Sequence, residues 1–451
     1  MGVFLQVKAQ KHKVSWKIFG KKKFKKKRYF YNHNSITMEH LYLNGKNSVV
    51  LTLIEEDTDK ETVKDVYING VKHDFETEEN PNKRAYAEEV KRKQYSKFLN
   101  NQFENLIILT GAGSSIGMGT GNKKGKILSQ LWDDSEKELT KEKFDILCEL
   151  VDYKDCDKEG KIIKNLEKLL SLANSAKIYI KSEKIDISDS VEKIKKLIKD
   201  SCTLELPENP PHSLLLNKVT KRKVTYPRVK LFTLNYDTLF EQAGKLSNFT
   251  IIDGFSFSLP RVFSGRNFDL DIVSRNNSRV KEEDNFVPKV FHLYKLHGSV
   301  DWCKEKNTIY QRDDVEDALM IYPNQSKYES SYEQPYFEMM SRFQQALRNE
   351  NVLLICIGFS FGDKHIVTAI KEALEQNPSF QLLVVNKGID VENENLKPFI
   401  DVAKEHNNIA FIAEKFEDFA KNYPDLKSYT QDDSNKIIIN LNNGNNESKS
   451  I

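Results

Sequence analysis

Two short motifs bring together side chains that could perform acid–base chemistry. Asn235 and Asp237 lie in Thr-Leu-Asn-Tyr-Asp, and His297 lies in Leu-His-Gly-Ser. A histidine titrates near neutral pH and suits the role of a general base, while an asparagine amide can hold a ribose hydroxyl or a water molecule. Asp237 could instead cap a helix, and Asn235 could form an Asx turn. The two motifs therefore predict a catalytic site, with local capping as the structural alternative.

A glycine-rich segment, Gly111-Ala112-Gly113-Ser114, follows the apolar run Leu106–Thr110. Glycines at this place let the backbone approach a pyrophosphate, and its N–H groups can bind the anion. The spacing departs from G-x-G-x-x-G, and the segment lacks the Lys-Ser/Thr pair of an NTPase P-loop. It predicts a dinucleotide site, and its alternative interpretation is a tight turn.

Further polar residues follow two later apolar runs. Gly358 and Ser360 come directly after Val352–Ile357, and Asn386 follows Gln381–Val385. Gly358 permits close approach of a ligand, and Ser360 can bond a ribose or phosphate oxygen. Motifs that each follow a strand converge at one edge of a parallel sheet, so we expect all of them to share one crevice.

The elements that must position these residues alternate between strand and helix patterns. Continuous apolar runs are typical of parallel strands that are buried on both faces, and helical patterns lie between several of them. The expected helices include Lys364–Gln376 and Lys415–Tyr423. The predicted fold class is α/β, with a Rossmann-like parallel sheet. The expected strands are Leu106–Thr110, Val229–Leu234, Thr250–Asp253, Phe291–Leu296, Leu319–Tyr322, Val352–Ile357, Gln381–Val385 and Ile409–Ile412.

The chain divides into four expected regions. Residues 1–38, with eleven Lys and Arg and no Asp or Glu, predict a basic disordered tail, and residues 39–83 a small extended appendage. Residues 84–425 form the main domain, and residues 426–451 a polar tail. The main domain contains a helical insertion at about 127–205, with helical patterns at Ser135–Val151, Lys161–Ala173 and Val191–Cys202.

Composition excludes several classes of protein. The 451 residues are 39% hydrophobic and 30% charged, within the globular range, and no apolar run is long enough to span a bilayer. Five cysteines at irregular spacing argue against a disulfide framework. With no apolar signal-peptide core near the N-terminus, these features predict a cytoplasmic protein. The basic tail alone leaves nucleic-acid binding undecided.

The ordered series of motifs resembles the sirtuin family over about residues 84–425. The resemblance implies that NAD⁺ is bound and that its nicotinamide–ribose bond is broken. It implies a general base at His297, with Asn235 and Asp237 near the nicotinamide ribose. The residues implied to hold the pyrophosphate side are Gly111, Ala112, Gly113 and Ser114, and those implied to line the adenosine part are Gly358, Ser360 and Asn386.

One departure from the family pattern concerns zinc. Protein-deacylating sirtuins carry a four-cysteine zinc module after the His-Gly motif, whereas only Cys303 and Cys356 follow His297 here. The chain is instead similar to divergent bacterial sirtuin-like NAD⁺ hydrolases of anti-phage defence. That similarity implies cleavage of NAD⁺ to nicotinamide and ADP-ribose without zinc. It also implies a homo-oligomer or a defence-system partner, such as a HerA-like ATPase or an Argonaute.

Three alternative functions remain at this point. The first is a protein-lysine deacylase with a zinc-free peptide channel, and the second is a non-catalytic NAD⁺ or ADP-ribose sensor that acts with a partner. The third, an NAD-dependent dehydrogenase, is disfavoured because the position of its ribose-binding acid falls in the helical insertion. We also expect either this insertion or the polar segment 264–284 to control access to the site.

Overall fold

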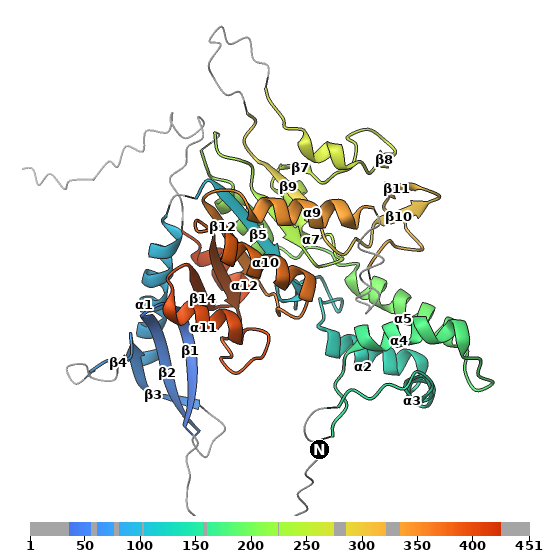
Figure 1. Cartoon of the computed structure of the whole chain (residues 1–451), viewed down its shortest axis with the longest axis horizontal. Coiled ribbons are helices and arrows are strands. Elements are labelled where there is room, and N and C mark those ends of the chain that lie inside the picture. The colour runs from blue at the N-terminus through green and yellow to red at the C-terminus, as the bar shows by residue number, and fades with distance from the viewer. Residues whose placement is uncertain are drawn as a thin grey trace, which may run out of the picture.

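The computed structural model describes residues 36–55, 61–75, 81–101, 103–156, 160–223, 225–274, 286–321 and 334–424 (Figure 1). The basic tail predicted over residues 1–38 lies outside these ranges except for its last three residues. The polar tail predicted over residues 426–451 lies wholly outside them.

A parallel sheet forms the centre of the molecule. Its strands are ordered β14-β13-β12-β5-β6-β9-β7, and each neighbouring pair is parallel. The chain enters at β5, adds β6 and β9 on one side, and later adds β12, β13 and β14 on the other. The prediction of an α/β, Rossmann-like parallel sheet is confirmed. The bounds are β5 Asn105–Thr110, β6 Lys230–Thr233, β7 Thr250–Ile252, β9 Val290–Lys295, β12 Val352–Ile357, β13 Gln381–Asn386 and β14 Ile409–Ala413.

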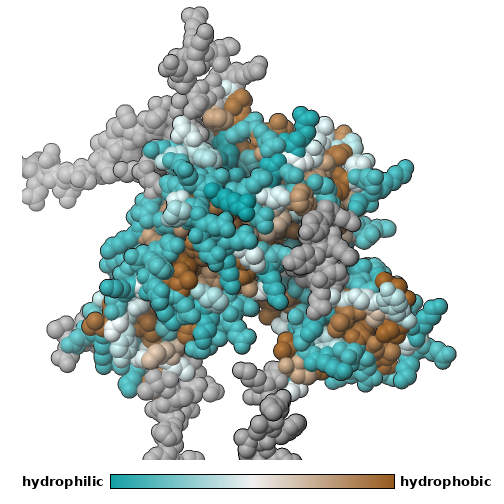
Figure 2. Space-filling view, viewed as in Figure 1, coloured by the Kyte–Doolittle hydropathy of each residue, from teal (hydrophilic) through white to brown (hydrophobic). Residues whose placement is uncertain are grey.

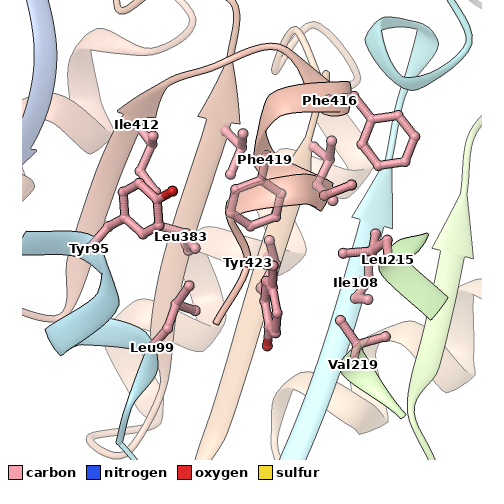
Figure 3. Close-up of a cluster of buried hydrophobic side chains, with 14 of the residues drawn as sticks. Tyr95, Leu99, Ile108, Leu215, Val219, Leu383, Ile412, Phe416, Phe419 and Tyr423 are labelled. Carbon is pink, nitrogen blue, oxygen red and sulfur yellow. The ribbon is translucent and has the colours of Figure 1, made fainter. Parts of the chain in front are cut away.

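Helices cover both faces of this sheet, because successive side chains of each buried strand point to opposite sides. Leu106 and Ile108 of β5 pack in one cluster with α1, α6, α7 and α12. Figure 3 shows Ile108 in this cluster with residues of α1, α6 and α12. Ile107 and Leu109 pack with α9, α10 and α11 on the other face. The bounds are α1 Lys83–Leu99, α6 Pro211–Val219, α7 Leu239–Leu246, α9 Tyr336–Leu347, α10 Lys364–Gln376, α11 Lys397–Glu405 and α12 Phe416–Asn422.

The extended N-terminal segment is built onto the edge of the main sheet. Strands β1 to β4 form an antiparallel ribbon, and β1 pairs antiparallel with β14. The side chain of Asn44 strengthens the join, because its Nδ2 donates to the Ile409 carbonyl at 2.8 Å. The segment therefore lengthens the sheet instead of standing apart from it. The bounds are β1 Ile36–Asn44, β2 Asn47–Glu55, β3 Glu61–Ile68 and β4 Val71–Lys72.

The insertion is helical and has a hydrophobic core of its own, formed by side chains such as Trp132, Leu169 and Ile194. Side-chain caps begin two of its helices, because Asn165 accepts from the Lys168 N–H and Asp186 accepts from the Ser188 N–H. Figure 2 shows apolar surface over this part of the molecule, at lower right. The bounds are α2 Leu128–Leu139, α3 Lys141–Leu150, α4 Leu166–Tyr179 and α5 Ile187–Cys202.

One predicted strand is wrong. Residues 319–321 do not join the main sheet, and residue 322 lies outside the described chain. Instead, Met320 forms an isolated bridge with Gly298, and the Ile321 N–H donates to the His297 carbonyl at 2.8 Å. The apolar segment therefore packs along the loop that follows β9 and supports it. Nearby, β8 Arg261–Val262, β10 Trp302–Glu305 and β11 Thr308–Gln311 form a separate small sheet.

The cysteines and the helices bear on the predictions that were made from composition. All five cysteines lie in the described residues and are free thiols. Among the described helices, none is both long and apolar enough to cross a membrane.

Candidate functional site

A cavity of about 400 Å³ lies where the order of the parallel strands reverses. Residues just beyond β5, β6, β9 and β12 line it, and β5 separates the two directions in which the sheet grows. Open α/β sheets bind ligands in the crevice at such a switch point, and this volume is typical of small-molecule sites. The helical insertion contributes another wall, with Lys126, Leu128, Asn165, Glu167 and Cys202 among its lining residues.

The structure brings most of the predicted site residues to this cavity. Those that line it are Gly111, Ala112, Asn235, Asp237, His297, Gly358 and Ser360. The other predicted residues support the lining loops from behind. Ser114 is fully buried and donates to the Gly111 carbonyl, Gly113 packs against Gly358, and Asn386 donates to the Phe359 carbonyl at 3.2 Å. Their contacts with a ligand stay predictions.

The two glycine loops touch each other, and this contact explains two of the glycines. Gly113 donates its N–H to the Gly358 carbonyl at 2.9 Å. A Cβ atom on Gly358 would lie 2.5 Å from the Gly113 Cα, and one on Gly113 would lie 2.5 Å from the Gly358 Cα. Gly358 also has a φ of +60°, which disfavours other residues. The close approach of the loops after β5 and β12 shapes the floor of the cavity.

Substitution of Gly358 by alanine should destabilise the protein more than a matched substitution elsewhere. Gly117 is the control, because its φ is +74° but a Cβ there would meet nothing within 4 Å. G117A carries only the backbone cost of about 1 kcal/mol, whereas G358A must also part the two loops, adding about 1–2 kcal/mol. Urea unfolding of both variants measures the difference. Equal losses would show that the loops separate without cost.

A chain of hydrogen bonds joins the two polar residues after β6 to the glycine loop. The Asn235 Nδ2 lies 2.8 Å from the Ser115 Oγ and 3.0 Å from the Gly111 carbonyl. Ser115 in turn donates to the Asp237 Oδ2 at 2.7 Å, and the other oxygen of Asp237 accepts from the Leu239 N–H. Asp237 therefore serves the start of α7 and the site at once. The catalytic interpretation and the capping interpretation of Asp237 are therefore compatible.

A buried ion pair fixes the position of the loop that carries Asn235 and Asp237. Lys295, the last residue of β9, is only 2% exposed, and its Nζ lies 2.9 Å from the Glu241 Oε1. The same Nζ donates to the backbone carbonyls of Asp237 and Tyr236. Burial lowers the pKa of Lys295, but the carboxylates around it, Glu241 foremost, outweigh burial and raise that pKa. The lysine thus stays charged and fixes the loop from 236 to 237.

His297 lies on the loop that follows β9, and its surroundings fix the path of that loop. Gly298 has a φ of +84°, and a Cβ there would lie 2.1 Å from the Leu319 carbonyl, so only glycine fits. The imidazole Nε2 lies 3.1 Å from the Asp363 Oδ2, and the Tyr236 ring centre is 6.5 Å from that of His297. The histidine is held by groups from three separate loops.

Sequence reasoning assigned no role to three residues of this site. Ser115 links Asn235 to Asp237, Tyr236 lies beside His297, and Asp363 pairs with His297. Ser115 and Tyr236 lie inside recognised motifs, directly beside residues that were assigned a role. Asp363 also ends a recognised motif, Gly358 to Asp363, but only the fold places it beside the histidine.

The sequence predicts that the site works without zinc. The ranges that the structure describes contain no cluster of three or more His, Cys, Asp or Glu side chains arranged to hold an ion. That zinc is not needed stays a prediction.

Comparison with known families supports the resemblance to sirtuins. Residues 229–412 match the family model of the SIR2-like domain. The SIR2-like match begins just before β6 and ends in β14, so it contains Asn235, His297, Gly358 and Asp363. The glycine loop after β5 and the helical insertion lie outside it. The match thus covers less than half of the chain, but it includes the cavity-lining residues that follow β6, β9 and β12.

Solved sirtuin structures also align with the chain. One is a Sir2 variant with a deacetylated p53 peptide and 3′-O-acetyl ADP-ribose, at 13% identity and a TM-score of 0.32, covering 73% of this chain and 96% of that chain. Another is Sir2Tm bound to a propionylated peptide, at 14% identity and a TM-score of 0.31, covering 73% of this chain and 95% of that chain. A search of curated proteins returned no match.

Proposed function

We propose that the protein hydrolyses NAD⁺ to nicotinamide and ADP-ribose. The observation that supports this most directly is the cavity at the strand switch point, where the glycine loop, Asn235 and His297 meet. Glycine-rich backbone suits a pyrophosphate, and the amide and imidazole suit a ribose and a water molecule. The SIR2-like match over residues 229–412 points to the same substrate.

The reaction needs little help to expel its leaving group. Nicotinamide is already cationic in NAD⁺, and the electron pair of the breaking C–N bond neutralises it as it departs. The ribose carbon then passes through an oxocarbenium-like state, as in glycoside hydrolysis. The oxygen of a water molecule forms the new bond to that carbon, and one proton of the water must be removed. A positioned base is therefore the main chemical contribution required from the protein.

The site residues divide this work between them. His297 takes the proton from the attacking water, and Asn235 positions the water or the ribose through its amide. Asp237 acts through Ser115, which it holds at 2.7 Å, and so keeps the Asn235 amide in place. The backbone of Gly111 and Ala112 faces the pyrophosphate, with Gly358 and Ser360 toward the adenosine. The supporting residues Gly113, Ser114 and Asn386 keep these loops in position.

In the cell, this activity would deplete NAD⁺, and we propose an anti-phage defence role in the cytoplasm. A hydrolase of this kind must be restrained until it is needed. The insertion forms one wall of the cavity, so self-assembly or a partner such as a HerA-like ATPase would act through it. Among the described residues of segment 264–284, none lines the cavity, and control of access by this segment stays a prediction.

A product assay tests the proposal. Purified full-length protein is incubated with NAD⁺, with and without an acetyl-lysine peptide, and the products are separated by chromatography. We expect nicotinamide and free ADP-ribose in equal amounts in both arms.

The other outcomes have distinct meanings. Acetyl-ADP-ribose formed only in the peptide arm would replace the proposal with a protein deacylase. Calorimetric titration with NAD⁺ completes the test. If NAD⁺ binds without any product, the assay is repeated with candidate partners and DNA, and binding that still gives no product would favour a sensor. Absence of both binding and products would contradict an NAD⁺ site altogether.

A further inference from the structure

Asp363 uses its two carboxylate oxygens for different tasks. Its Oδ1 accepts from the His365 N–H at 3.1 Å and caps α10 at its N-terminus. Its Oδ2 lies 3.1 Å from the His297 Nε2. The side chains of His297 and Asp363 are 14% and 9% exposed, so water competes weakly for this contact. The pair bridges the loop after β9 and the loop after β12, across the mouths of β5 and β6.

The contact determines which ring nitrogen carries the hydrogen. A neutral imidazole has one N–H donor and one basic nitrogen, and an ionised carboxylate can only accept. Next to Asp363, the hydrogen therefore belongs on Nε2, and the basic lone pair belongs on Nδ1. The N-terminus of α10 favours the ionised form of Asp363, because the helix dipole is positive there.

Capping alone does not account for this aspartate. Serine and asparagine cap helices about as well, and the cap engages only one of the two oxygens. The second oxygen lies against His297, which lines the cavity together with Asp363 itself. The negative charge contributes modestly to the helix N-terminus, and the same carboxylate also faces His297.

We propose that Asp363 is a positioning residue for the reaction, holding His297 in the Nε2–H tautomer with Nδ1 as the basic nitrogen. This inference rests on the proposed function for its kinetic consequence but not for its structural content. Asp363 contributes no atom to the products, and its effect passes through the imidazole. Its loss should therefore lower kcat while leaving the KM for NAD⁺ nearly unchanged.

Two variants separate this role from capping. D363N keeps the shape and the cap but removes the charge, and D363S keeps the cap but cannot reach His297. We expect both to unfold at nearly the wild-type temperature and to lose at least ~100-fold in kcat, with KM changed by less than about threefold. Wild-type turnover in either variant, with the fold intact, would reduce Asp363 to a helix cap.

A spectroscopic measurement tests the tautomer without any turnover. Long-range ¹⁵N–¹H correlation spectra of histidine-labelled protein distinguish the two neutral tautomers, and subtraction of the H297Q spectrum identifies His297. We expect the Nε2–H pattern in the wild type and its loss in D363N, whose side-chain amide can donate a hydrogen to Nε2. An Nδ1–H pattern in the wild type would overturn the inference. If NAD⁺ is not turned over at all, the proposed function fails, yet this spectrum still decides the position of the hydrogen.

Discussion

Replacing His297 with alanine should lower the turnover of NAD⁺ by a factor of ~10²–10⁴, the usual contribution of a positioned general base. The imidazole lines the cavity with Asn235 and the glycine loop, and within this lining it is the group best suited to take a proton near neutral pH. Binding of NAD⁺ should survive, since the backbone and amide contacts remain. Initial rates of ADP-ribose release at saturating NAD⁺ measure the effect.

A histidine outside the site provides the control. His406 follows α11 and is exposed, so H406A should retain wild-type turnover. Circular dichroism and thermal unfolding of both variants show whether the fold is kept. A folded H297A that works within about twofold of the wild type would remove His297 from the mechanism and move the search for the base to the insertion wall.

The sequence predicted the central strands well because they are buried on both faces. Val352–Ile357 and Lys364–Gln376 begin and end where expected, since an uninterrupted apolar run precedes Gly358 and Asp363 caps the helix. The residues of these two segments and their immediate neighbours were enough to predict where each segment begins and ends. The pairing of β1 with β14 could not be predicted in this way, because it joins residues such as Tyr42 and Ile412, far apart in the chain.

Segment 319–321 shows how an apolar pattern can mislead. Its residues are apolar because they pack against the loop that carries His297, and their backbone bonds go to that loop instead of a sheet neighbour. A strand and a supporting segment of this kind have the same composition. The alternation of buried residues does not distinguish them over so short a run.

The site was predictable in its location but less so in its internal contacts. Parallel strands deliver Asn235, His297 and Gly358 to one edge, so the topology alone brings them together. Which side chains then touch depends on loop paths that the sequence does not encode locally. The pairing of His297 with Asp363 and the mutual contact of two glycine loops are contacts of this type.

Replacing Lys295 with methionine should cost about 3–5 kcal/mol of stability, because it leaves Glu241 buried without its partner. Burial already raises the pKa of Glu241 to about 7, against the opposing attraction of Lys295. Without that attraction the pKa rises further. A carboxyl pKa raised above its unfolded value means that stability is lost as the pH increases, so the loss should be larger at pH 8 than at pH 6. Urea unfolding at both pH values measures it.

Two comparisons show whether the cause is the unpaired carboxylate. K245M changes an exposed lysine of the same helix as Glu241 and should alter stability by less than about 0.5 kcal/mol. The double variant K295M/E241M removes both charges and should recover much of the loss, since a well-packed apolar pair can replace a buried ion pair. Lys295 also binds the carbonyls of Tyr236 and Asp237, and the double variant lacks these contacts. The double variant should therefore still hydrolyse NAD⁺ more slowly than the wild type, even though its stability is recovered. A single variant as stable as K245M at pH 8 would mean that water or another cation reaches Glu241, and the ion pair would then not support the loop that presents Asn235.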